Sequence, residues 1–136
     1  MAIYDNLPAY KAAYDLLVDI YKANINLPRE YRYTLGEKMK TELTDLLVCI
    51  YKANSNDYQK EENLRYAREH IVVVKLYLRL LHDLGQISQK RLVAFTEQTE
   101  GISKQLTAWL KSTQRKNKQD DGSLFSDADL SAKDDE

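Results

Sequence analysis

The feature of the sequence that most constrains its fold is a ten-residue segment that occurs twice. Residues 15–24 read Asp-Leu-Leu-Val-Asp-Ile-Tyr-Lys-Ala-Asn, and residues 45–54 repeat nine of these ten residues at an offset of 30. The apolar residues of each copy have the spacing of an amphipathic helix. Leu27-Pro28 separates the copies, and a residue before proline is pushed out of helical geometry. The duplication therefore predicts a helical hairpin, whose apolar face needs further helices to cover it.

The composition favours a few long helices in a single domain. The chain has 136 residues but only four glycines and two prolines for turns, and no stretch shows the period of two that marks a strand. We predict helices at about residues 7–24, 31–54, 57–84 and 88–116. The second helix could instead begin at Thr34, because Thr34 and Glu37 have the spacing of a capping box. The predicted fold class is all-α, an antiparallel up-down-up-down four-helix bundle over residues 1–118.

Three of the predicted helices carry a clear apolar face at three- and four-residue spacing. In the first helix this face consists of Leu7, Tyr10, Ala13, Tyr14, Leu17, Ile20 and Tyr21. In the second helix it consists of Leu35, Met39, Leu43, Leu46, Leu47 and Ile50. In the fourth helix it consists of Leu92, Phe95, Ile102, Leu106 and Trp109, with Thr99 filling the one missing step. This last seam resembles that of a coiled coil, which is how four-helix bundles pack.

The third predicted helix has more apolar surface than one core requires. Its apolar and aromatic positions cover well over half of the circumference, whereas a bundle core needs an arc of about 100° or somewhat more. Two interpretations are open. The surplus could form a second buried surface, most simply a contact between copies of the chain, or the helix could be central and wrapped by its neighbours.

The same helix aligns basic residues along one side. Arg65, Arg68, Lys75 and Arg79 fall with His82 inside an arc of about 100°, interrupted only by an apolar valine. We expect these cations to have no acidic partners on their own arc. A stripe of this kind is typical of a surface that contacts phosphates, and the alternative is a solvated face.

The fourth predicted helix adds Lys104, Lys111, Arg115 and Lys118 on one face. Glu97 and Glu100 lie on the same face toward the helix N-terminus, an arrangement that complements the helix dipole. That pattern favours a solvated, dipole-matched face for this helix. The candidate nucleic-acid-binding residues of the whole chain are Arg65, Arg68, Lys75, Arg79, Lys104, Lys111 and Arg115.

The C-terminal segment, residues 119–136, has a different composition from the rest of the chain. Residues 120–136 contain seven acidic side chains and one lysine, a net charge of −6, so that residues 1–119 carry a net +5 and the whole chain −1. Few large apolar residues occur in this segment, which predicts an acidic, disordered tail. Such a tail can serve solubility alone, or its Leu124, Phe125 and Leu130 can dock transiently.

The sequence lacks the motifs of common catalytic and cofactor sites. Its glycines are isolated, so there is no phosphate loop or dinucleotide-binding fingerprint. His70 and His82 lack the glutamate three residues earlier that di-iron bundles use, and no Cys/His cluster suggests zinc. We therefore expect no enzymatic activity, no catalytic residue, no metal and no cofactor. His70 is predicted to pack in the core, and the single cysteine, Cys49, to be a structural thiol.

Targeting signals are also missing from the sequence. No apolar run approaches the roughly 18 residues that a membrane-spanning helix needs, and the first residues do not resemble a signal peptide. One cysteine cannot form an internal disulfide. These observations predict a cytoplasmic protein that does not contact a membrane.

The segment Leu-Pro-Arg-Glu-Tyr-Arg-Tyr-Thr-Leu-Gly-Glu-Lys-Met, residues 27–39, resembles a signature of the four-helix-bundle family that contains the accessory variability determinant (Avd) of diversity-generating retroelements. Residues 50–55, 78–85 and 102–109 also match, so the resemblance covers about residues 7–115. The wider relatives are proteins encoded in intervening sequences of bacterial 23S rRNA genes. The chain lacks the Asn-Ile-Ala-Glu-Gly type of segment of that branch, which favours the Avd branch.

The resemblance implies a non-enzymatic partner of a reverse transcriptase. Such proteins are barrel-shaped homopentamers that bind the polymerase and RNA or DNA during mutagenic retrohoming, and this chain has no Tyr-x-Asp-Asp motif of its own. Avd proteins are strongly basic, whereas residues 1–119 carry only +5, so nucleic-acid affinity is expected to depend on oligomerisation. The alternative is a structural or interaction bundle of the intervening-sequence type, without nucleic-acid binding.

Overall fold

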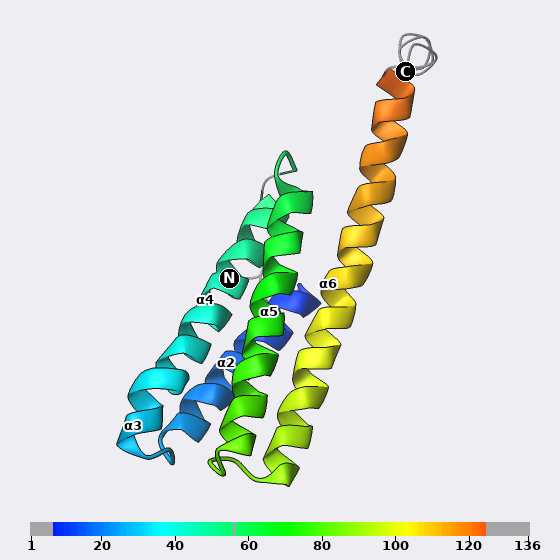
Figure 1. Ribbon diagram of the computed structural model, residues 1–136. Coiled ribbons are helices and arrows are strands. Elements are labelled where there is room, and N and C mark those ends of the chain that lie inside the picture. The colour runs from blue at the N-terminus through cyan, green and yellow to red at the C-terminus, as the bar shows by residue number, and fades with distance from the viewer. Residues whose placement is uncertain (1–6, 56, 125–136) are drawn as a thin grey trace, which may run out of the picture.

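The computed structural model describes residues 7–55 and 57–124, with side chains as far as residue 119. The elements in chain order are α2 (Pro8–Asn24), α3 (Arg29–Tyr31), the π-helical turn η1 (Arg32–Gly36), α4 (Glu37–Ser55), α5 (Lys60–Asp83) and α6 (Gln89–Leu124). These described ranges contain no strand. The long helices α2, α4, α5 and α6 form a four-helix bundle (Figure 1), which confirms the predicted all-α fold.

Each long helix packs against two neighbours. α4 packs on α5, α5 packs on α6, and α2 closes the bundle by packing on both α4 and α6. Short connections between successive helices give antiparallel neighbours. As a result α5 and α6 share one face of the bundle, and α2 and α4 share the opposite face.

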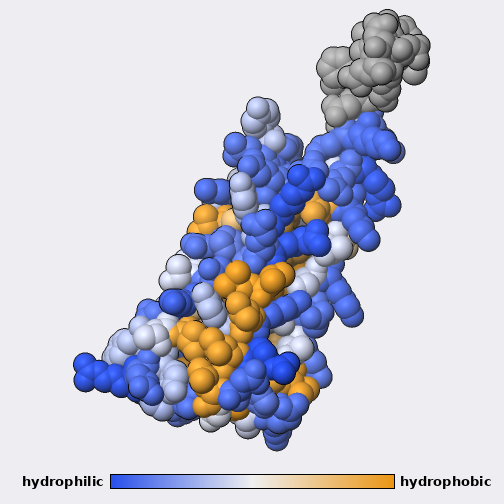
Figure 2. All heavy atoms as spheres, in the orientation of Figure 1, coloured by the Kyte–Doolittle hydropathy of each residue, from blue (hydrophilic) through white to orange (hydrophobic). Residues whose placement is uncertain are grey.

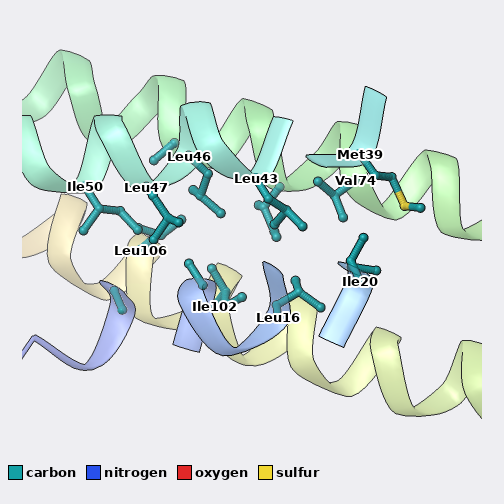
Figure 3. Close-up of a cluster of buried hydrophobic side chains, with 14 of the residues drawn as sticks. Leu16, Ile20, Met39, Leu43, Leu46, Leu47, Ile50, Val74, Ile102 and Leu106 are labelled. Carbon is teal, nitrogen blue, oxygen red and sulfur yellow. The ribbon is translucent and has the colours of Figure 1, made fainter. Parts of the chain in front are cut away.

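The core lies along the axis between these helices. Figure 3 shows Leu16 and Ile20 of α2 pointing toward Leu43, Leu46 and other apolar residues of α4, with α5 and α6 completing the cluster. All six residues of the face predicted for the second helix, which lie in η1 and α4, are buried or half-buried, as are the predicted residues of α6. Thr99 is fully buried at the missing step of the α6 seam.

The predicted face of α2 was partly wrong. Tyr14 and Tyr21 are 51% and 50% exposed, whereas Leu16, which was not assigned to this face, is fully buried. The side chain of a tyrosine can lie along the edge of an apolar face with its hydroxyl in water. In addition, the Lys40 ammonium lies over the Tyr21 ring, 4.3 Å from its centroid, a favourable cation–π contact at the α2–α4 edge.

The capping box predicted at Thr34 and Glu37 is also wrong. The backbone runs as a helix from α3 through η1 into α4 without interruption, so no free helix N-terminus exists at Thr34. The backbone N–H of Glu37 already donates to the carbonyl of Thr34. The Thr34 hydroxyl points back along the helix and donates to the carbonyl of Glu30.

Specific side chains of the proline-containing segment hold the turn between α2 and α3 in place. The Arg32 guanidinium donates hydrogen bonds to the carbonyls of Ile25 (2.8 Å) and Leu27 (3.1 Å), which α2 and its turn leave without helical partners. Asn24, only 3% exposed, lies against Gly36. A Cβ at Gly36 would be 2.9 Å from the Asn24 side-chain nitrogen. Glycine at this position therefore lets α2 end directly against the start of the second helical segment.

The ends of α5 and α6 carry recognisable signals. Gly85 has φ +74°, and the N–H of Gln86 bonds to the carbonyl of Leu81 at 2.8 Å, which is a glycine-terminated helix end. Ser88 caps α6, since its hydroxyl accepts a hydrogen bond from the N–H of Arg91 at 3.1 Å. α6 continues to Leu124, eight residues beyond its predicted end. The predicted division between bundle and acidic tail at residue 118 stays a prediction, because residues 125–136 lie outside the described residues.

Candidate nucleic-acid interface

Three of the four candidate basic residues of α5, Arg65, Arg68 and Lys75, lie at the side of the helix that borders α6. Arg65, Arg68 and Arg79 are exposed, and Lys75 is half-buried. Their placement outside the core agrees with the predicted stripe. His82, the last residue of the arc, is half-buried as well.

The expectation that these cations have no acidic partners on their own arc is wrong. Arg65 forms an ion pair with Glu61 (2.7 Å), and Arg79 forms one with Asp83 (3.1 Å). Both carboxylates lie four residues away along α5, and residues at that spacing share a helix face. The spacing of the cations alone does not reveal these two acids. Arg68 differs, because it has neither an ion pair nor a hydrogen bond with any residue in the described part of the chain.

Lys75 is paired across the interface between helices. Its ammonium lies 2.8 Å from a carboxylate oxygen of Glu100 on α6, and this hydrogen bond lowers the pKa of Glu100 below its ordinary value. Arg79 similarly lowers the pKa of Asp83. A lowered carboxyl pKa in the folded state contributes stability above the ordinary pKa, which is lost as the pH falls through the folded value. Both pairs are therefore intact at neutral pH.

The basic residues of α6 have fewer ion-pair partners than those of α5. Lys104, Lys111 and Arg115 are exposed, and none of them forms an ion pair or hydrogen bond with a residue that the structure describes. Glu100, which the sequence placed on their face, is engaged by Lys75. Together with Arg68, these three residues are the unpaired cations of the candidate set.

A groove runs between α5 and α6 and brings part of the set together. It has a volume of about 660 Å³ and is lined by Arg65, Arg68 and Lys75 on α5 and by Ser103 and Thr107 on α6. Apolar side chains of α5 and the carboxylate of Glu69 complete the lining. The guanidinium and ammonium groups at this groove have the chemistry to bind phosphate oxygens.

The groove separates the candidate residues into three groups. Arg65, Arg68 and Lys75 line it, whereas Lys104, Lys111 and Arg115 lie on the exposed face of α6 beside it. Arg79 is not part of the lining and is paired with the acid at the C-terminal end of α5. Most of the basic stripe predicted on α5 thus lines one side of the groove. A second row of basic residues lies on α6, beyond the other side of the groove.

Ser103 and Thr107 were not singled out from the sequence. They lie one helical turn apart on α6, between the apolar seam and the basic row, and the Ser103 hydroxyl oxygen is buried without a hydrogen-bond partner. Small polar residues four apart next to an apolar seam are a signal that could have indicated a helix edge facing a groove. Alone, that pattern is common on solvated helices.

The exposed side of α5 carries an apolar ridge of Val72, Leu76, Leu80 and Leu84, and the first of these, Val72, also lines the α5–α6 groove. These residues succeed each other at intervals of four, and Val72 and Leu76 are 59% and 60% exposed. Figure 2 shows apolar side chains gathered on the face where α5 lies in Figure 1. The interpretation of α5 as a helix wrapped by its neighbours is therefore wrong, because its surplus apolar surface faces outward. Exposed apolar patches of this kind are typical of interaction surfaces, and a contact between copies of the chain stays a prediction.

His70 and Cys49 are the remaining titratable residues that the sequence analysis singled out. His70 was predicted to lie in the core, but it is half-buried at the α4–α5 edge, with its Nδ1 2.6 Å from a carboxylate oxygen of Glu42. Cys49 is half-buried, and burial raises the pKa of its thiol. In the described part of the chain, no group of three histidine, cysteine or acidic residues is placed to hold a metal ion.

The helices also lack the character of membrane spans. None of them, within the residues that the structure covers, is both long enough and apolar enough to cross a membrane.

Comparisons with known proteins agree with the four-helix fold and with the family resemblance of the sequence. A solved structure of a Bacteroides thetaiotaomicron protein of unknown function, from the S23 ribosomal protein family, superposes with a TM-score of 0.69 at 16% identity. The match covers 76% of this chain and 95% of that one, and at this identity it shows a shared fold. A search of curated proteins found no match. The model of the bAvd-like family matches residues 9–113, and because this match spans most of the chain, the protein belongs to the bAvd-like family.

Proposed function

We propose that the chain is a cytoplasmic, non-enzymatic accessory protein of a diversity-generating retroelement, which binds a reverse transcriptase and nucleic acid during mutagenic retrohoming. Membership of the bAvd-like family supports this role. The observation that carries the nucleic-acid part is the α5–α6 groove, where Arg68 has no partner among the described residues and an unpaired basic row lies on the neighbouring helix.

The proposed contact is with the phosphate backbone. In the part of the chain that the structure describes, Arg68, Lys104, Lys111 and Arg115 are unpaired, so phosphates do not have to displace a carboxylate from them. Arg65 and Lys75 are paired with Glu61 and Glu100, and they contribute only after exchange of partners. Contacts of this type carry no sequence information and release counterions, so affinity falls steeply with salt.

The proposed assembly is a homo-oligomer held through the apolar ridge of α5. Four outward apolar residues on one helix are more than a solvated face needs, and burial of such a ridge against another copy is favourable. The number of subunits, five, is the expectation from the family resemblance. An assembly multiplies the few unpaired cations of each copy, which raises affinity through effective concentration.

The nucleic-acid proposal is tested with two matched double variants. Arg68→Glu with Lys111→Glu removes one unpaired cation that lines the groove and one in the basic row of α6 beside it. Lys22→Glu with Lys38→Glu makes the same change in net charge on α2 and α4. Affinity for a labelled single-stranded RNA of mixed sequence is measured across a salt series. We expect about a tenfold or larger loss for the groove variant at low salt and a much smaller loss for the control. Equal losses of affinity in the two double variants would mean that binding depends on net charge alone and not on the groove.

The assembly and the polymerase contact need separate measurements. Leu76→Glu on the ridge is expected to convert the oligomer to 15.8 kDa monomers in light scattering, whereas Val93→Glu, at another exposed apolar position on α6, leaves the assembly intact. Co-purification with the reverse transcriptase encoded beside its gene tests the polymerase contact. A wild-type monomer, or no such neighbouring gene, would contradict the respective part of the proposal.

A second candidate function is a structural or interaction bundle of the intervening-sequence type. The pairing of Arg65, Lys75 and Arg79 with carboxylates favours it, because three of the four stripe cations on α5 are already neutralised within the chain. In that case the wild-type protein shows no salt-sensitive binding to RNA or DNA, while the ridge still mediates assembly.

A further inference from the structure

The acidic end of the chain follows the helix that carries three of the four unpaired cations. Residues 125–136 contain five acidic residues and one lysine, a net charge of −4. They come directly after α6, the helix that carries Lys104, Lys111 and Arg115. The two segments of opposite charge are therefore joined by a single continuous helix.

The course of α6 decides where the acidic segment starts. Gln114 and Asn117 donate hydrogen bonds to the carboxylate of Glu61 on α5 (3.2 and 3.3 Å), which fixes α6 against the start of that helix. Beyond this point α6 continues to Leu124, past the α4–α5 connection (Figure 1). The acidic segment thus leaves from the end of the bundle at which the basic row of α6 terminates.

The length of the segment is sufficient to reach the whole basic row. At the rise of an α-helix, Leu124 lies about 14 Å from Arg115 and about 30 Å from Lys104 along α6. Twelve extended residues span at most about 40 Å. A segment of this length is therefore long enough to reach from Leu124 to the face of α6 beside the α5–α6 groove.

The distribution of ion pairs decides which cations are available to the acidic segment. Arg65, Lys75 and Arg79 already contact carboxylates of the bundle, whereas Arg68 and the basic row of α6 have no partner in the described part of the chain. A tethered carboxylate meets these cations at an effective concentration set by its short linker.

We propose that residues 125–136 fold back onto the α5–α6 face, pair with Arg68, Lys104, Lys111 and Arg115, and compete there with nucleic-acid phosphates. This inference adds regulation to the site and rests on the proposed function for its consequence, although the contact itself does not. The tail acts as an internal competitor, so RNA binds fully only when it displaces the acidic segment. Exposed ion pairs are individually weak and salt-sensitive, which makes the competitor displaceable by a polyanion.

The contact is tested without nucleic acid by zero-length carbodiimide cross-linking, which joins carboxylates to lysines, and by mass spectrometry of the cross-linked full chain. We expect tail carboxylates to be joined to Lys104 and Lys111 in preference to Lys22 and Lys38 on the opposite helices. These links should disappear at high salt and in a variant with Asn or Gln at Asp127, Asp129, Asp134, Asp135 and Glu136. Links spread evenly over all lysines, or none to α6, would overturn the proposal.

The competition is tested by RNA affinity. The neutral-tail variant keeps the length of the chain, and we expect it to bind a single-stranded RNA of mixed sequence about tenfold more tightly than wild type at low salt. In a Lys104→Gln, Lys111→Gln, Arg115→Gln background, neutralising the tail should change affinity far less. An unchanged affinity, or an equal gain in both backgrounds, contradicts competition at this face. If no variant binds RNA while the α6 cross-links are present, the proposed function fails and the tail contact stands.

Discussion

The two copies of the ten-residue segment have nearly the same sequence but end in different surroundings. Leu16 and Ile20 in the first copy, and Leu46 and Ile50 in the second, are all buried at the bundle axis. The final asparagines differ, because Asn24 is buried and Asn54 is exposed. The repeat therefore fixes which side of each helix faces the core, whereas the burial of its last residue depends on the chain beyond the repeat.

The cause lies twelve residues further along the chain. Asn24 packs against Gly36 at the start of the second helical segment. A glycine admits the close approach of a neighbouring helix end, and the residue at the corresponding distance from Asn54 is the exposed Tyr66. The proline-containing turn is thus a close-packed junction.

The largest expected effect tests whether the two copies are equivalent in the core. Leu16→Ala and Leu46→Ala each remove a fully buried side chain, and each should lower the free energy of unfolding by about 2–5 kcal/mol. Because both leucines lie at matching positions, we expect similar losses in urea denaturation of the two variants. A loss of stability confined to one variant would show that the two copies do not contribute equally to the stability of the bundle.

A smaller effect tests the junction at which the copies differ. Gly36→Ala should lower the free energy of unfolding by about 1–3 kcal/mol, because the added Cβ would lie 2.9 Å from the Asn24 side chain. Asn24→Ala in the same chain should restore much of this loss. Gly101→Ala is the matched control, since nothing lies within 4 Å of its Cβ position, and it should raise stability by about 0.5–1 kcal/mol. Thermal unfolding of wild type, Gly36→Ala, Asn24→Ala and the double variant gives the coupling between the two residues.

The single sequence difference between the copies should have a smaller consequence again. Asp19 accepts a hydrogen bond from the amide of Gln98 on α6 (3.0 Å), whereas the second copy has Cys49 at the same place. Asp19→Ala is expected to cost about 1 kcal/mol in denaturant unfolding. Asp45→Ala, at an exposed position of the second copy, should be nearly neutral. A reversed order would mean that the contact between α2 and α6 contributes nothing.

The smallest expected effect concerns the thiol of Cys49 in the second copy. Burial raises its pKa above the ordinary value for cysteine, so the neutral thiol persists in the folded protein at a pH where an unfolded chain has ionised. Stability should therefore fall as the pH rises from the ordinary pKa toward the folded value, and Cys49→Ser should abolish this dependence. Alkylation by iodoacetamide should be slower in the native protein than in urea at the same pH. Equal rates would place the thiol in open solvent.

Most of the bundle could be predicted from the sequence, because helical periodicity is a local property. The faces of α4 and α6 and the stop at Gly85 result from spacing and from the conformational freedom of glycine. The errors arose where a side chain has two compatible positions. Tyrosines at the edge of α2 satisfy an apolar pattern while staying half in water, and Thr34-Glu37 satisfies a capping pattern inside a continuous helix.

The candidate interface was less predictable than the fold. The sequence alone determined which residues are basic and on which helical arc they lie, and it indicated a surplus of apolar surface on α5. Only the tertiary structure decided that Lys75 pairs with Glu100 across two helices, that Arg68 is left unpaired among the described residues, and that the surplus forms an outward ridge. The physical reason is that charge and periodicity are properties of one helix, whereas pairing and exposure depend on how close a second helix comes.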